Sequence, residues 1–249
     1  MIGFTHDDYR GLIRFLKNDL GYFVGPFRDF PDSGNAIILR HDIDFSISKA
    51  FEMAQIEADL SVCATYFVLL STPFYNALEK HNIDTLKKIN CLGGELGLHY
   101  DASLFEGMEM EQINKHVQRQ VKILEAFTET KIVSISQHKP ARSKIRPQIA
   151  QYRNAYEDKY FKNIGYLSDS RKHFGALDVH GFFKEHIHKR SQLLIHPIWW
   201  NAKDLPIAKI FEDLRLEIGA FNKRELDDFY RGIEDYFQEK SNEHMAKDG

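Results

Sequence analysis

Residues 36–44 read Ala36-Ile37-Ile38-Leu39-Arg40-His41-Asp42-Ile43-Asp44, and this stretch decides the fold. Its apolar first half is typical of a parallel strand that is buried on both faces. A helical pattern follows over residues 46–60, where apolar residues recur at helical spacing, at Ile47, Ala50, Phe51, Ala54 and Ala58. A buried strand that leads directly into a helix is the repeating unit of an α/β fold with a parallel sheet.

The same unit recurs along the chain. Further strands are predicted at residues 63–70, 95–99, 131–138, 166–170 and 191–196. Helices are predicted over a stretch that carries Ile113, Val117, Val121 and Leu124, and again around residues 147–160. Alternation of strands and helices indicates parallel pairing in a barrel or a wound sheet.

Extra helices are expected at both ends of the chain. Thr5 and Asp8 form a capping-box pattern at the start of an N-terminal helix. A helix that starts at residues 204–206 and a last helix that starts at Asn222 are predicted, with a charged tail that frays beyond Gln238. We therefore expect one domain over residues 1–249, with its core at about 36–200 and C-terminal helices over 204–238.

The composition excludes several classes of protein. The chain has 249 residues, with 33 Lys and Arg against 36 Asp and Glu, and this balance argues against nucleic acid as a partner. The first residues contain no secretory signal and no apolar run approaches the roughly 18 residues of a membrane span, so we expect a cytoplasmic protein. Two cysteines, Cys63 and Cys91, offer neither a disulfide framework nor a zinc-binding spacing.

Polar residues gather at the carboxyl ends of the predicted strands. They are Asp42, Asp44, His99, His138, Asp169 and His196. In parallel α/β folds the loops that follow the strands converge at this end and form the functional face. A single histidine at a strand end is more often structural, but four strands that end in this way indicate a site.

The pair Asp42 and Asp44 points to a cation. The two-residue period of a strand places both carboxylates on one face, with Cα atoms roughly 6–7 Å apart. Two such carboxylates repel each other unless a cation lies between them or one takes a proton. If one carboxylate binds a divalent metal and the other is left free as a base, this repulsion is relieved. The alternative is a surface turn in which Asp44 or Ser46 caps the following helix.

The order and spacing of five motifs resemble those of another group of proteins. The motifs are residues 40–44, 64–70, 94–99, 138–140 and 194–196, and together they resemble the polysaccharide deacetylases of the NodB-homology type, carbohydrate esterase family 4. The resemblance is closest to relatives associated with O-antigen and capsule biosynthesis. It implies a distorted (β/α) barrel that binds zinc or a similar divalent metal and removes acetyl groups from sugars.

The resemblance also implies roles for individual residues. Asp42 would be the base, Asp44 and His99 metal ligands, and His196 the general acid, while Asp169 would match the family's fourth motif. The family's second histidine ligand falls on Ser103, and its Arg-Pro motif reads His138-Lys139-Pro140 here. Because a catalytic zinc ion is usually bound by three protein ligands, we expect His138 to supply the third, with His41 as a weaker candidate.

The substrate-binding residues are expected to be Arg40, Tyr75, Trp199 and Trp200. The two tryptophans suit stacking on a sugar ring, although packing in the core explains them equally well. His180, His186 and His188 are interpreted as part of a solvated, charged stretch rather than a metal cluster.

Two hypotheses of function follow. The first is a metal-dependent hydrolase that removes an acyl group from a sugar or a sugar-nucleotide-like intermediate of surface polysaccharide biosynthesis. The second is a catalytically degenerate relative that binds a carbohydrate or a biosynthetic partner, which the serine at position 103 favours. Metal-free acid and base chemistry by Asp42, Asp169 and His196 is a weaker third. The sequence leaves a homodimer open.

Overall fold

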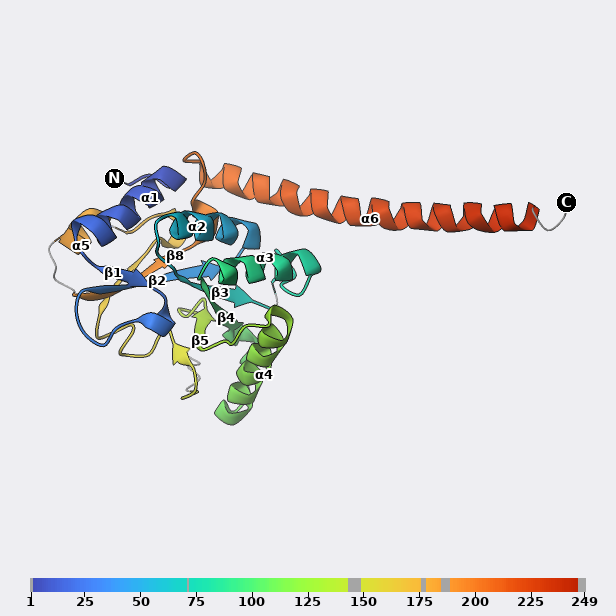
Figure 1. Cartoon of the computed structure of the whole chain (residues 1–249). Helices are drawn as coiled ribbons and strands as arrows, with labels where there is room; N and C mark the ends of the chain where they lie inside the picture. Colours follow the sequence, from blue (N-terminus) through green and yellow to red (C-terminus); the bar gives the residue numbers. More distant parts are fainter. Residues whose placement is uncertain (1, 71, 143–148, 176–177, 185–188, 246–249) are drawn as a thin grey trace. The chain divides into compact units, whose positions relative to one another are not determined.

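The computed structural model describes residues 2–70, 72–142, 149–175, 178–184 and 189–245, with side chains up to Tyr236 (Figure 1). The chain divides into two compact units, Met1–Leu205 and Pro206–Gly249, and each is described by itself. That the whole chain is one domain therefore stays a prediction.

A curled parallel sheet forms the centre of the first unit (Figure 1). Its described strands are β1 Phe23–Gly25, β2 Ala36–Ile43, β3 Thr65–Leu69, β4 Glu95–Asp101, β5 Ser134–His138, β6 Arg153–Asn154, β7 Gly165–Ser168 and β8 Arg190–Ile195. They lie in the order β6-β5-β4-β3-β2-β8-β7, and β1 adds beside the first half of β2. All pairs are parallel, which confirms the expected distorted (β/α) barrel.

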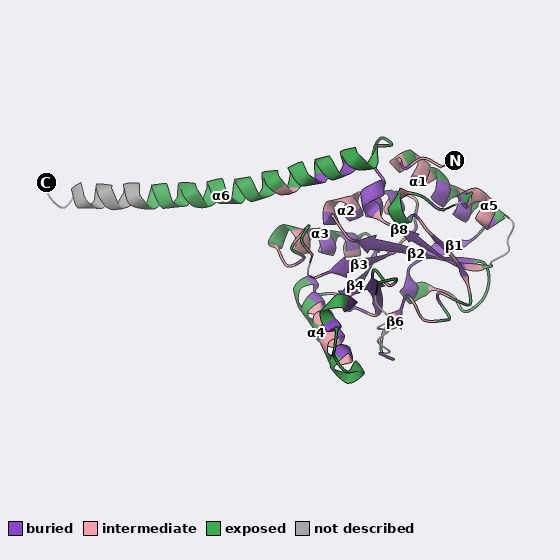
Figure 2. Ribbon diagram, turned by 180° about the vertical axis from the view of Figure 1, so that it is seen from behind, coloured by how far each residue is buried: buried purple, intermediate pink, exposed green. Residues whose placement is uncertain are grey.

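Helices flank the sheet. They are α1 His6–Arg14, α2 Ile47–Asp59, α3 Lys80–Cys91, α4 Met110–Thr128 and α5 Val179–Lys184. Short helical turns lie at η1 Phe15–Asp19, η2 Phe27–Asp29, η3 Ala102–Phe105, η4 Ser170–Lys172 and η5 Pro197–Trp199. The strands are buried while the helices keep exposed outer faces (Figure 2).

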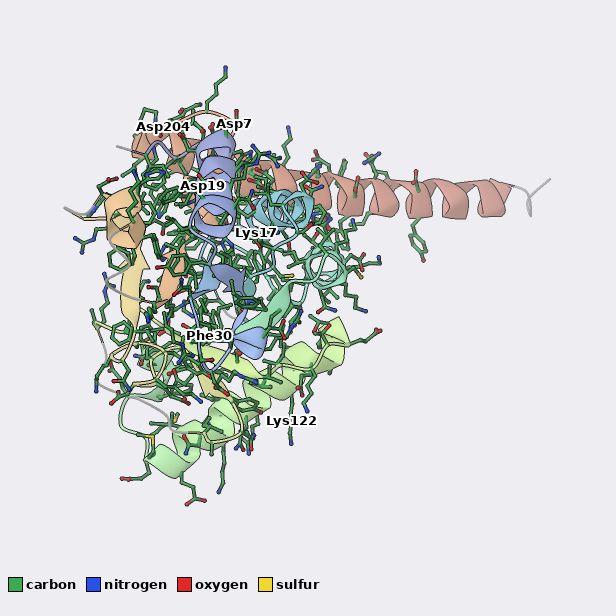
Figure 3. The ribbon with its side chains drawn as sticks, turned by 60° about the vertical axis from the view of Figure 1, so that its left-hand side comes forward. Asp7, Lys17, Asp19, Phe30, Lys122 and Asp204 are labelled. Atoms are coloured by element: carbon green, nitrogen blue, oxygen red, sulfur yellow. The ribbon has the colours of Figure 1, made fainter. Side chains whose placement is uncertain are left out.

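Local sequence explains where the helices begin and which face they bury. Thr5 and Asp8 form the predicted capping box at the start of α1. On α4 the four predicted apolar positions are all buried, while Lys122 on the same helix is exposed and is labelled in Figure 3. This amphipathic division is what fixes α4 against the sheet.

The helix predicted around residues 147–160 is wrong where the structure describes it. Residues 149–160 contain β6 and turns, and residues 143–148 lie outside the described part. The backbone N–H of Arg153 donates to Val133, and that of Ala155 donates to Ile135, so this segment joins the sheet. Tyr152, Tyr156 and Tyr160 are spaced four residues apart, as in a helix, but pairing with the sheet overrides this local pattern.

The second unit is one helix, α6 Ile207–Met245, where two helices were predicted. Pro206 precedes it, as expected for a helix start. Asn222 does not begin a new helix, because no proline interrupts the stretch and an interior glycine such as Gly219 costs only about 1 kcal/mol. The backbone is helical past Gln238 as far as Met245, and the fraying expected beyond Gln238 stays a prediction.

Among the described helices, none has the combined length and apolar character that crossing a bilayer would require.

Candidate metal centre

Three side chains meet at the carboxyl ends of β2, β4 and β5. Oδ1 of Asp44 lies 3.4 Å from Nε2 of His99 and 3.3 Å from Nδ1 of His138, and the two nitrogens are 3.2 Å apart. Ligand atoms about 2.1 Å from a tetrahedral zinc ion lie about 3.4 Å from one another. The three atoms therefore already have the mutual spacing of a set of zinc ligands, as does no other cluster of three such groups in the described residues.

Asp44 is available for a metal because another residue caps the next helix. The side chain of Ser46 accepts the hydrogen bond from the backbone N–H of Lys49 and begins α2. Oδ1 of Asp44 is buried and makes no hydrogen bond of good geometry. Burial would raise the pKa of Asp44, but the imidazoles of His138 and His99 hold it well below its usual range, so the carboxylate is ionised. A buried anionic oxygen facing two imidazole nitrogens fits a divalent cation.

The ring of His99 is oriented by its other nitrogen. Nδ1 lies 3.1 Å from the carbonyl oxygen of Ser136, to which it donates its hydrogen. This contact turns Nε2 toward Asp44 and His138, in the way that groups behind a metal site orient a histidine ligand. The acceptor is a backbone carbonyl of the neighbouring strand, which the β4–β5 register places opposite His99, so side-chain alternation in the sequence could not have indicated this support.

Asp42 lies beside the three ligands and is held by Arg40. Nε of Arg40 donates to Oδ1 of Asp42, and Nη2 donates to Oδ2, each at 2.8 Å. Oδ2 of Asp42 is also 3.5 Å from Nε2 of His99. Burial would raise the pKa of Asp42, but the Arg40 guanidinium lowers it, so this carboxylate is also ionised.

Arg40 was expected to bind substrate, but its side chain has no exposed surface. Its remaining donors reach Oε1 of Gln192, Oγ of Ser136 and the hydroxyl of Tyr156. Arg40 therefore lies beside the Asp42 carboxylate rather than at a surface where a substrate could dock. A glycine makes this packing feasible, since a Cβ on Gly97 would lie 2.5 Å from the Phe67 ring over which the guanidinium sits.

His196 is held on the other side of the site by Asp169. Nδ1 of His196 lies 2.6 Å from Oδ1 of Asp169, whose Oδ2 accepts a hydrogen bond from Nε1 of Trp200 at 2.9 Å. Nε2 of His196 is 4.0 Å from Oδ2 of Asp44. Burial would lower the pKa of His196, but Asp169 raises it to about 9, so the imidazole is a cation at neutral pH.

The other expected substrate-binding residues differ in their exposure. Trp200 is completely buried and its indole N–H donates to Asp169, so this tryptophan packs in the core and does not face a substrate. The hydroxyl of Tyr75 donates to the carbonyl of Ile43 and accepts from the N–H of Leu69, which ties the ends of β2 and β3 together. Trp199 is buried as well, and its ring lies 6.3 Å from that of Phe45, the residue after Asp44.

The remaining histidines lie elsewhere. His41 points to the opposite face of β2, where its Nε2 lies 2.6 Å from Oε1 of Glu57, as strand alternation predicted. His180 is on α5, and the stretch that carries His186 and His188 lies outside the described residues. Ser103 is exposed in η3 and does not take part in the cluster of ligands.

A pH dependence follows if His196 is the proton donor in a reaction at this site. Activity should fall as pH rises through about 9. With a metal bound the fall should come at a lower pH, because a cation beside Asp44 favours loss of the His196 proton. Replacing Asp169 with Asn removes the charge that raises the pKa and should move this descending limb to lower pH. The dependence of kcat on pH measures both, and an unmoved limb in D169N would contradict the assignment of His196.

The chain is distantly similar to several solved structures. No protein-family model matches the chain, and no curated protein matches it. A CE4 family pseudoenzyme from Bacillus anthracis is 17% identical over 75% of this chain, with a TM-score of 0.46. A family 4 carbohydrate esterase from Bacillus anthracis is 16% identical over 83% of this chain and 86% of its own, with a TM-score of 0.42.

A chitin deacetylase from the fungal pathogen Colletotrichum lindemuthianum is 13% identical over 78% of this chain and 86% of its own, with a TM-score of 0.46. The present chain spans 63% of the length of the pseudoenzyme. All three likenesses are distant, with identities of 13–17% and TM-scores below 0.5.

Proposed function

We propose that this protein is a metal-dependent hydrolase that removes an acyl group from a sugar or a sugar-derived intermediate. The observation that supports it most is the mutual spacing of three ligand atoms, 3.2–3.4 Å apart, with an ionised carboxylate at their side. Asp44, His99 and His138 would hold the metal. Two imidazoles and one carboxylate are a ligand set that suits zinc. A divalent metal bound there supplies polarisation of an acyl carbonyl and acidifies water.

The chain's own residues divide the proton transfers between them. Asp42 is ionised and accepts a proton from the attacking water, while Arg40 fixes the direction in which the carboxylate points. His196 carries a proton at neutral pH and donates it to the departing amine or hydroxyl. Asp169 keeps that imidazole oriented and charged. The base and the acid thus have pKa values displaced in opposite directions, which suits their two tasks.

The substrate class is part of the same proposal. The partly exposed ring of Tyr75 and the remaining exposed edge of Trp199 would contact an acylated sugar, such as a sugar-nucleotide-like small molecule. A soluble intermediate of surface polysaccharide biosynthesis, handled in the cytoplasm, fits the sequence resemblance best.

Metal content gives the direct test of this proposal. We expect one divalent ion per chain in the purified protein, measured by elemental analysis after dialysis. Removing it with a chelator should abolish hydrolysis of acetylated sugars and lower the melting temperature, since the ion binds only the folded state. Readdition of zinc should restore both. Repeated absence of metal from chains reconstituted with zinc would instead favour the degenerate, carbohydrate-binding alternative.

A further inference from the structure

The helix α6 exposes large apolar side chains along its described length. Most of its described length is exposed (Figure 2). The most exposed apolar side chains are Leu216, Leu226, Phe229, Tyr230 and Tyr236, of which Leu226 and Phe229 are 69% and 71% exposed. Scattered exposed apolar residues are normal, but this many on one helix, several of them at helical spacing, mark an interaction surface.

Eight apolar residues of α6 form a pattern that is symmetric about a point near the middle of the helix. Two blocks each have steps of three, four and three residues, the first at Phe211, Leu214, Ile218 and Phe221, the second at Leu226, Phe229, Ile233 and Tyr236. Leu214 is already buried within the chain, so the pairing would use the remaining members, centred on Ile218, Phe221, Leu226 and Phe229. The steps are the same when the helix is read backwards, with the centre between Lys223 and Arg224. Such a pattern is self-complementary under a two-fold axis perpendicular to the helix.

We propose that α6 pairs with α6 of a second copy of this chain in an antiparallel arrangement. Rotation about the centre places Phe221 opposite Leu226 of the second copy, and Ile218 opposite its Phe229. The first block of each helix then meets the second block of the other. Each copy contributes the same surface, as in the usual closed dimer.

Charge favours the antiparallel orientation over a parallel one. Residues 224–245 contain seven acidic and three basic residues, whereas residues 207–223 contain three of each. A parallel pair places the two acidic halves side by side, where like charges repel. The antiparallel pair places each acidic half beside a balanced half of the other copy.

The apolar area is sufficient for a specific dimer. A helix of 39 residues is about 58 Å long, and each of the four side chains nearest the centre buries on the order of 100 Å² when covered. With the flanking side chains of both helices, the pair reaches the roughly 1,200 Å² at which specific interfaces begin.

The mass of the full-length protein in solution tests the pairing. Sedimentation equilibrium at micromolar concentration should give twice the 29.1 kDa of one chain. Replacing Leu226 and Phe229 together with Glu should raise the dimer Kd more than about 100-fold, because both charges would be buried at the interface. Leu216→Glu is the matched control, since Leu216 is 58% exposed but belongs to neither block, and should change the Kd less than about threefold.

Far-UV circular dichroism and metal content of each variant establish that the fold is kept. A monomer at 100 μM with its helix intact would overturn the proposal, since the face would then serve another partner. A dimer that the Leu226 and Phe229 replacements leave unchanged would overturn it as well.

Cross-linking tests the orientation. In a background where Cys63 and Cys91 are replaced with Ser, a chain carrying both F221C and L226C should form intermolecular disulfides. A chain carrying L226C alone should not, because the two copies of position 226 lie beyond disulfide reach in the antiparallel pair. Efficient cross-linking by L226C alone would indicate a parallel pair and overturn the arrangement.

Discussion

Replacing Asp42 with Asn should reduce turnover about 10³-fold while leaving the metal in place. The amide has the size of the carboxylate but cannot accept a proton from water, and removal of a general base typically costs 10²–10⁴-fold in rate. The three proposed ligands are unaltered, so elemental analysis should still find one divalent ion per chain. The release of acetate from acetylated sugars or an aryl acetate measures the loss.

Asp101→Asn is the matched control for this variant. Asp101 also lies at the end of a strand, β4, but its Oδ1 accepts a hydrogen bond from the backbone N–H of Ser103. We expect this variant to keep activity within a few-fold of the parent. If D42N retained more than a tenth of the parent's activity with metal bound, another group would have to accept the proton.

Six of the eight described strands were predictable because their signals are local, whereas β1 was not predicted and β6 lies where a helix was expected. The apolar run of residues 36–39 predicted β2, and polar residues at the strand ends predicted the functional face. That Asp44, His99 and His138 would meet also followed, since carboxyl ends of parallel strands share one edge of a sheet. The structure places their ligand atoms within 3.4 Å of each other.

The role of Arg40 could not be predicted in full. Its strand position indicates that it shares a face with Asp42, but not whether the guanidinium reaches inward or to the surface. Its burial depends on Gln192 and Tyr156, which come from 152 and 116 residues further along the chain. Contacts over such sequence distances are set by the closed packing of the core and leave no local pattern.

The helices were predicted less well than the strands. Tyrosines at four-residue spacing in residues 152–160 imitate a helix, but Tyr156 and Tyr160 instead reach Arg40 and the core beside Phe27. In the second unit, Asn222 and Glu225 imitate a helix start within a helix that continues. In both places a short motif satisfied a local rule, and the surrounding chain determined the outcome.

Replacing His138 with Ala should remove the metal. The three ligands lie at mutual distances of 3.2–3.4 Å, and losing one leaves Asp44 and His99, too few to hold zinc tightly in a catalytic site. We expect the affinity for zinc to fall at least 100-fold, with activity lost at the zinc concentrations that saturate the parent. Zinc titration against a chromogenic chelator measures this loss directly.

Ser103→Ala distinguishes the two possible sources of the third ligand. Ser103 occupies the position at which the resemblance expects a histidine, yet it is exposed in η3 and stands outside the cluster. We therefore expect S103A to bind zinc as tightly as the parent, because His138 from the neighbouring strand has taken over that position in the coordination sphere. If S103A lost metal and H138A kept it, the ligand set of Asp44, His99 and His138 would be wrong, and with it the hydrolytic function that depends on it.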